Sequence, residues 1–130
     1  MIKCGIDILQ VSRCEDAVSK MNFADNVFTD AEKEYMSGKL EAGQIRGYKF
    51  FECVAGLFCA KEAVLKALGV GIIYIGVLKD VEIGHEKSGE PFAKIYGKLA
   101  EKFPKHKGKK LAVSISHDGG FAIAECVIDR

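Results

Sequence analysis

The stretch from about Tyr48 to Leu68 constrains this chain most, because it predicts one long helix that must pack against a core. Gly69 follows directly and is well placed as the C-terminal cap of that helix. The apolar residues of its second half recur at helical spacing, as Val64, Leu65 and Leu68. A helix of this length requires other elements of the chain to cover its apolar sides.

The same helix carries the charges Lys61, Glu62 and Lys66. Glu62 and Lys66 are four residues apart and therefore share one helix face. Taken alone, the pair is interpreted as an exposed ion pair on an amphipathic helix. Whether these charges belong to a site depends on partners elsewhere in the chain.

Length and charge set the class of protein. With 130 residues and a net charge of +1, we expect a single domain spanning residues 1–130 that interacts with neither nucleic acid nor membrane. The chain has no pattern of a signal peptide or a transmembrane helix. Its five cysteines lack zinc-site spacing, and we expect them to be reduced in a cytoplasmic protein.

The first strand, from Met1 to Val11, is rich in β-branched residues but holds an acid, Asp7, at its centre. A buried carboxylate without partners costs several kcal/mol, roughly, so Asp7 needs an explanation. It is either a structural acid bonded to backbone N–H groups or a ligand-binding or catalytic acid. The residues around Asp7 do not decide between these two interpretations.

Capping motifs predict two short helices after this strand. Ser12 with Glu15 predicts one that runs to about Asn22 and has Arg13 in its first turn. Thr29 with Glu32 predicts a second that runs to about Ser37. The glycines at positions 38, 43 and 47 then indicate a loop before the long helix.

The rest of the chain predicts paired strands. Residues 72–78 are interpreted as a connector or a weak strand, residues 80–83 and 91–96 as a hairpin, and residues 97–103 as a helix. Two further strands, 111–117 and 121–128, flank a strong turn signal. His85 and His106 are interpreted as solvated loop residues. We expect an α+β fold, with a mostly antiparallel sheet packed on the long helix.

Two carboxylates with neighbouring lysines are typical of magnesium-dependent phosphoryl chemistry. Mg²⁺ takes one or two carboxylates and completes its shell with phosphate oxygens and water, while lysines neutralise the departing phosphate. The chain has neither a P-loop nor a dinucleotide-binding glycine motif. The candidate set comprises Asp7, the charges of the long helix, the glycines after it and Ser114–His117.

In this order the motifs resemble the short, bacterial holo-acyl-carrier-protein synthases, a branch of the 4′-phosphopantetheinyl transferases. The resemblance spans nearly the entire chain. It is carried by Gly5-Ile-Asp7-Ile-Leu with Arg13, Phe28-Thr-x-x-Glu32, the run from Ala55 to Gly71, Asp80-Val-Glu-Ile with Gly89-Glu-Pro91, and Val113-Ser-Ile-Ser-His117.

The resemblance implies transfer of phosphopantetheine from coenzyme A to a serine of apo-acyl carrier protein, with adenosine 3′,5′-bisphosphate as the second product. It implies that Asp7 and Glu62 hold Mg²⁺ and, with Lys66, form the catalytic set. Either Glu62 or a metal-held water is then the general base. It also implies that Arg13 docks the acidic carrier protein.

Binding of coenzyme A is implied for a further set of residues. Lys61 is expected to contact phosphate or to orient Glu62, and the two glycines to let the backbone approach the ligand. The set is Lys49, Lys61, Lys66, Gly69, Gly71, Ser116 and His117.

One residue departs from the family pattern. Leu57 stands where the family has an arginine that helps to bind the nucleotide, and Lys49 or Arg46 is expected to replace it. The departure suggests two alternatives to the transferase: a catalytically weak coenzyme A-binding module, or a carrier-protein-binding protein without catalysis.

Larger relatives contain two such units in one chain, with the active site between them. The resemblance therefore implies that this chain completes its cleft with neighbouring copies, as a homotrimer built on the apolar surface of its sheet. It also implies a role in fatty acid biosynthesis. The lysine-rich segment 102–110 is a second candidate surface for an acidic carrier protein.

Overall fold

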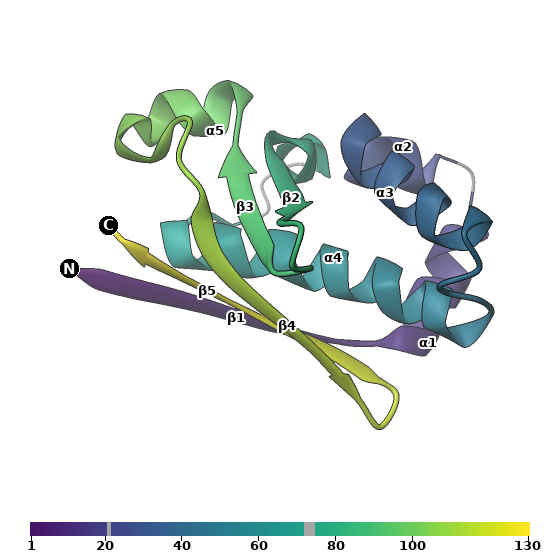
Figure 1. Ribbon diagram of the computed structural model, residues 1–130. Coiled ribbons are helices and arrows are strands. Elements are labelled where there is room, and N and C mark those ends of the chain that lie inside the picture. Colours follow the sequence, from purple (N-terminus) through teal and green to yellow (C-terminus); the bar gives the residue numbers. More distant parts are fainter. Residues whose placement is uncertain (21, 72–74) are drawn as a thin grey trace.

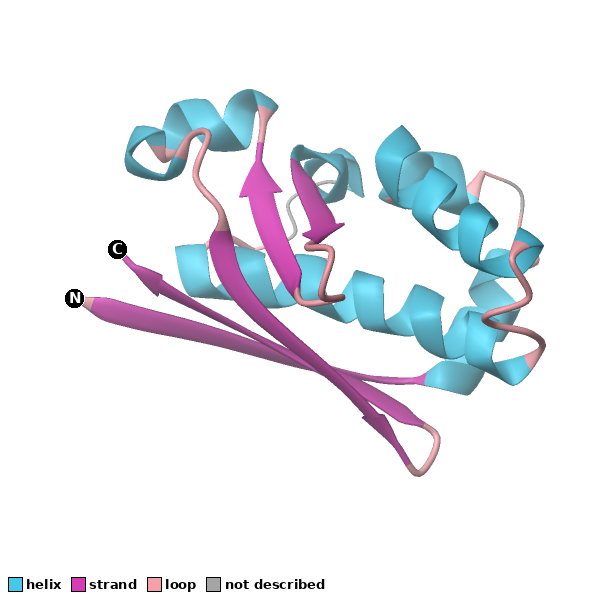
Figure 2. Ribbon diagram, in the orientation of Figure 1, coloured by secondary structure: helices cyan, strands magenta, loops and turns pink. Residues whose placement is uncertain are grey.

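The computed structural model describes residues 1–20, 22–71 and 75–130. Within them, five strands form one antiparallel sheet in the order β1-β5-β4-β3-β2 (Figure 1). The strands are β1 (Ile2–Gln10), β2 (Val81–His85), β3 (Pro91–Ile95), β4 (Leu111–Asp118) and β5 (Phe121–Asp129). Figure 2 shows the three long strands running beneath one long helix. The predicted α+β fold class is thus confirmed.

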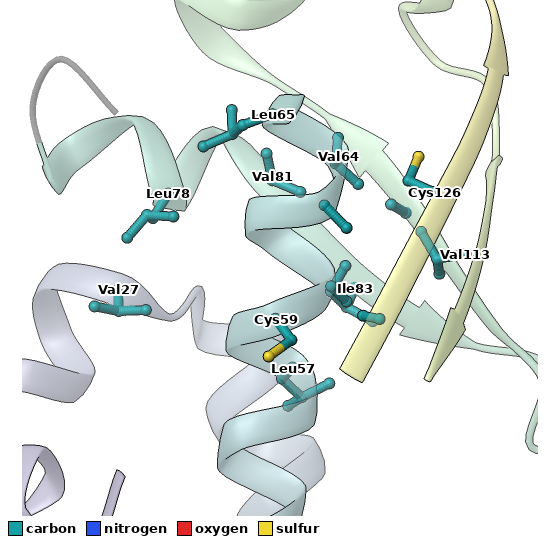
Figure 3. Close-up of a cluster of buried hydrophobic side chains, with 14 of the residues drawn as sticks. Val27, Leu57, Cys59, Val64, Leu65, Leu78, Val81, Ile83, Val113 and Cys126 are labelled. Atoms are coloured by element: carbon teal, nitrogen blue, oxygen red, sulfur yellow. The ribbon is translucent and has the colours of Figure 1, made fainter. Parts of the chain in front are cut away.

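The long helix, α4 (Tyr48–Leu68), has the bounds predicted from the sequence. Gly69 caps it in the left-handed conformation, with φ 74°, and its N–H bonds to the carbonyls of Leu65 and Lys66. The core lies between α4 and the sheet. Figure 3 shows Leu57 and Val64 of α4 in one cluster with Val113 and Cys126 of the sheet.

Strand β5 alternates between the two faces of the sheet. Ala122, Ala124, Cys126 and Ile128 are buried beneath α4. The opposite face, which we call the outer face, is apolar and exposed. Its large side chains are Ile2, Ile6 and Ile8 of β1 and Phe121, Ile123 and Val127 of β5, with exposed fractions from 36% to 67%.

The helices between β1 and α4 differ in part from the prediction. The helix α1 (Val11–Val18) begins one residue before Ser12, and its N-cap, Gln10, makes no side-chain capping bond. The predicted capping box at Ser12 is therefore wrong. Val11 is fully buried and its N–H bonds to Gly120 O of the β4–β5 turn at 2.9 Å, so the strand passes directly into the helix.

Two further helices precede α4. The five-residue helix α2 (Phe23–Val27) was not predicted. In α3 (Asp30–Glu41) the capping box of Thr29 and Glu32 is confirmed, but the helix continues through Gly38 rather than ending before it. Glycine inside a helix costs only about 1 kcal/mol relative to alanine, so Gly38 alone does not end α3.

The remaining short helices connect α4 to β2 and β3 to β4. Of the predicted connector, residues 72–74 lie outside the described part of the chain, and the 3₁₀ helix η1 (Ile75–Asp80) follows. The helix α5 (Gly97–Lys102) and the 3₁₀ helix η2 (Pro104–His106) precede β4. All five cysteines are free thiols. In the described part of the chain, no helix is both long and apolar enough to cross a bilayer.

Candidate active site

A glycine lets β1 lie directly against α4. A Cβ at Gly5 would stand 2.1 Å from Ala63 O and 2.5 Å from Ala67 N, both backbone atoms of the helix. No other residue fits this contact without moving the strand. The contact explains why a glycine comes two residues before Asp7, because it sets the distance between that acid and the charges of α4.

Asp7 and Lys66 meet across this contact. Lys66 Nζ lies 3.1 Å from Asp7 Oδ1 and also donates to Ile6 O at 2.9 Å. The Asp7 side chain is 13% exposed, whereas that of Lys66 is 53% exposed. The acid is therefore held in place by the fold, while the lysine reaches it from solvent and is free to exchange partners.

Asp7 and Glu62 line the same pocket, which we call the carboxylate pocket. It has a volume of about 390 Å³ and receives Arg13 as its third charged residue. Burial raises the pKa of Glu62, the negative charge of Asp7 raises it further, and Lys66 opposes both. The rest of the wall is apolar and consists of Ile8, Leu9, Cys14, Ala17, Phe23 and Phe58.

This pocket suits a hard divalent cation bound together with a phosphate ligand. A cation between Asp7 and Glu62 would relieve the repulsion that raises the pKa of Glu62. In the described residues, no group of three or more acidic, histidine or cysteine side chains is placed to hold a metal ion. Two carboxylates with phosphate and water oxygens make up the ligand set that Mg²⁺ uses in such sites. The residues present therefore fit Mg²⁺.

A second pocket of about 270 Å³, which we call the cationic pocket, lies further toward the N-terminal half of α4. Two lysines, Lys39 and Lys49, and one acid, Glu52, line it, together with the rings of Tyr35, His85 and His117. Tyr35 and His85 stack in parallel, with ring centroids 4.0 Å apart. His85 was interpreted as a solvated loop residue, and this stack corrects that interpretation. Aromatic rings beside lysines make this pocket suited to an anionic, aromatic ligand.

Gly56 positions His117 in the cationic pocket. A Cβ at Gly56 would stand 2.7 Å from His117 Nε2 and 2.9 Å from Ile115 Cγ2. The strand can therefore lay the imidazole on the helix surface only because position 56 has no side chain. Ser116, the preceding residue, points to the outer face, where it lines a shallow depression with Ile6 and Glu125.

Lys61 does not lie where the sequence analysis placed it. Its side chain is fully buried, and its ammonium pairs with the carboxylate of Glu32, which is also fully buried. Burial lowers the pKa of Lys61, and Glu32 opposes that effect. The expected contact of Lys61 with phosphate is thus corrected, because its ammonium faces α3 and β2 rather than a pocket.

The other expected residues are distributed as follows. Lys49 and His117 share the cationic pocket, and Arg13 shares the carboxylate pocket with Asp7 and Glu62. Gly69 and Gly71 are exposed, and in the described part of the chain they border neither pocket. The two pockets have no residue in common.

Sequence reasoning missed several residues of the cationic pocket besides His85. Lys39 lies on α3 just beyond Gly38, where the sequence predicts a loop, whereas Tyr35 lies inside the predicted helix but carries no local signal of a pocket. Gly56 lay inside the matched run from Ala55 to Gly71, but its role depends on the register between β4 and α4. Arg46, expected as a substitute for the missing arginine, borders neither pocket in the described part of the chain.

Comparison with known proteins identifies the family. Residues 3–126 match the family model of the 4′-phosphopantetheinyl transferase superfamily. A holo-(acyl-carrier-protein) synthase of Geobacter metallireducens is 36% identical over 128 residues, which cover 97% of this chain and 95% of the relative.

Two solved structures agree with this match. A holo-(acyl-carrier-protein) synthase of Bacillus anthracis, in complex with CoA (3′,5′-ADP), has a TM-score of 0.73 and 30% identity, covering 96% of this chain and 93% of its own. The Helicobacter pylori synthase in complex with coenzyme A has a TM-score of 0.72 and 32% identity, covering 97% of each chain. This chain therefore belongs to the 4′-phosphopantetheinyl transferase superfamily, and within it to the holo-acyl-carrier-protein synthase enzymes.

Proposed function

We propose that this protein transfers the 4′-phosphopantetheine group of coenzyme A to a serine of an apo-acyl carrier protein. The serine oxygen forms a bond to the phosphorus that carries the pantetheine arm, and the pyrophosphate P–O bond to the nucleotide breaks. The serine proton passes to a base, and adenosine 3′,5′-bisphosphate leaves. The observation that carries the proposal is that Asp7 and Glu62 line one pocket, with Lys66 bonded to Asp7.

Asp7 and Glu62 are the residues that would hold Mg²⁺ against the pyrophosphate. Bound there, Mg²⁺ would neutralise the charge that develops on the pyrophosphate oxygens. The exposed ammonium of Lys66 exchanges its bond to Asp7 for one to the departing phosphate. Glu62 is one candidate for the base, since burial raises the pKa of its carboxyl group, and a metal-held water is the other.

The cationic pocket is proposed to take the nucleotide end of coenzyme A. Lys49 and His117 were expected there, and Lys39 adds a second ammonium close to Tyr35. Leu57 is 2% exposed and forms part of the wall, so the charge of the family arginine is missing from this position. We propose that Lys39 and Lys49 together replace that charge.

The separation of the two pockets supports a site completed between copies of the chain. One coenzyme A molecule must reach both the carboxylate pocket and a cationic pocket. The exposed apolar outer face offers a surface on which copies can associate. We therefore propose a homotrimer in which the carboxylate pocket of one copy faces the cationic pocket of the next. A mixture of Asp7→Asn protein and His117→Ala protein should then be more active, at low coenzyme A concentration, than either variant alone.

Arg13 is proposed to dock the acidic carrier protein beside the reacting groups, because it is exposed and lines the carboxylate pocket. The lysine-rich segment 102–110 lies at the other end of the molecule from α1 (Figure 1). Of the two candidate surfaces, Arg13 is thus the one next to Asp7 and Glu62 within one copy.

Release of adenosine 3′,5′-bisphosphate tests the proposal. The protein is incubated with coenzyme A, an apo-carrier protein and Mg²⁺, and the nucleotide is quantified by chromatography. We expect release that requires the carrier and stops when a chelator is added. Binding of coenzyme A without release would favour the non-catalytic binding module. Binding of the carrier alone would favour a non-catalytic partner protein.

A further inference from the structure

One buried carboxylate, that of Glu32, connects the start of α3 with α4 and β2. The Glu32 side chain accepts hydrogen bonds from Lys61 Nζ of α4, from the Thr29 N–H at 2.9 Å and from the Ile83 N–H of β2 at 2.8 Å. Both Glu32 and Lys61 have side chains with no exposed surface. We call these two residues the buried pair.

The buried pair adjoins the elements that build the cationic pocket. Tyr35 and Lys39 follow Glu32 on α3, and His85 follows Ile83 on β2. The third wall of this pocket comes from α4, the helix of Lys61. The pair therefore bonds together the three elements whose side chains must face one another there.

The buried pair also reaches the carboxylate pocket. Lys61 immediately precedes Glu62, and its ammonium lies 5.4 Å from the centre of the Phe28 ring. Phe28 packs edge-on against Phe23, and Phe23 stacks with Phe58, at centroid distances of 6.1 Å and 6.3 Å. Phe23 and Phe58 both line the carboxylate pocket.

A buried ion pair is a costly way to fill a core. Apolar side chains of similar volume often give equal or greater stability, because charges lose their hydration on burial. What the pair supplies in addition is direction, since each hydrogen bond fixes one element against another. Loss of one partner leaves a buried charge, whereas loss of both removes only the directional bonds.

We propose that Glu32 and Lys61 are positioning residues, which hold α3, β2 and α4 in the register that shapes both pockets. The inference rests on the proposed function for its kinetic consequence. It assigns to Lys61 a task other than contact with substrate.

The test uses Lys61→Met, Glu32→Gln, the double variant and the control Lys33→Met. Lys33 is the next residue on α3 and pairs at the surface with Asp25 at 2.5 Å. The melting temperature of each variant is measured by thermal unfolding. The kinetic assays, at 25 °C, give kcat/KM for coenzyme A and the Mg²⁺ concentration for half-maximal rate. Calorimetry with coenzyme A and Mg²⁺, and the backbone amide shifts of Tyr35 and Phe23, give readouts that do not need turnover.

We expect each single variant of the buried pair to melt at a lower temperature and the double variant to regain most of that loss. All three should nevertheless show kcat/KM at least tenfold below wild type, weaker coenzyme A binding and displaced Tyr35 and Phe23 amide shifts. Lys33→Met should match wild type. If the single variants do not fold, the double variant decides alone.

A double variant with wild-type kcat/KM, Mg²⁺ requirement and amide shifts would overturn the inference and leave the pair a role in stability only. If wild-type protein transfers no phosphopantetheine, the proposed function fails instead. Calorimetry and the amide shifts then still test whether the pair positions both pockets.

Discussion

Replacing Gly5 by alanine places a methyl group 2.1 Å from Ala63 O and 2.5 Å from Ala67 N. Both atoms belong to the backbone of α4, so no side-chain rotation relieves the clash. To reach an ordinary contact of about 3.4 Å, β1 must move away from α4 by about 1.3 Å. Overpacking of this kind costs about 1–3 kcal/mol, which lowers the melting temperature by roughly 4–12 °C for a domain of this size.

The same displacement moves Asp7 relative to Glu62. A misplacement of about 1 Å at a reacting centre lowers the rate by about 10²-fold. We therefore expect Gly5→Ala to lose about two orders of magnitude in kcat at 25 °C, where the protein remains folded by circular dichroism. Gly38→Ala is the matched control, because a Cβ there meets nothing within 4 Å and should leave kcat unchanged. Wild-type kcat and melting temperature in Gly5→Ala would refute the reasoning.

Three further predictions follow from the two pockets. Asp7→Asn and Glu62→Gln should each remove most of the transfer in a turnover assay while circular dichroism stays that of wild type, and undiminished turnover would exclude them as metal ligands. Gly56→Ala should raise KM for coenzyme A several-fold with little change in kcat, because its Cβ displaces His117, and an unchanged KM would contradict this placement. Burial, aided by a nearby lysine, lowers the pKa of His85, so folding favours its neutral form. The free energy of unfolding should therefore fall as pH decreases through and below about 6.5. His85→Phe should lose part of that dependence in urea titrations at pH 5 and pH 7.5. If the free energy of unfolding changes equally between these two pH values in wild type and in His85→Phe, the assignment is contradicted.

Local sequence patterns were enough to predict the framework of the fold. The apolar spacing and Gly69 defined α4, and the turn after Asp118 paired β4 with β5. Short-range signals failed where a tertiary contact determined the outcome. The helix α1 begins at Val11 because that residue is buried and bonds to the turn at Gly120, a contact invisible to a capping rule.

The site was predictable in part for the same reason. Asp7 and Glu62 were brought together by resemblance to a family, and both line one pocket of the structure. The position of Lys61 was not predictable, because its partner Glu32 lies 29 residues earlier in the chain and also completes a capping box. The alternation of apolar residues along β4, in contrast, places His117 on the face of Ile115, toward α4, and Ser116 on the opposite face.

The mass of the intact carrier protein tests the central claim most directly. An apo-carrier protein is incubated with coenzyme A, Mg²⁺ and this protein, and is then weighed by mass spectrometry. We predict a gain of one phosphopantetheine unit on a single serine, which is absent with chelator and with Asp7→Asn. A carrier mass that stays unchanged, although another transferase modifies the same preparation, would contradict the assignment of this activity.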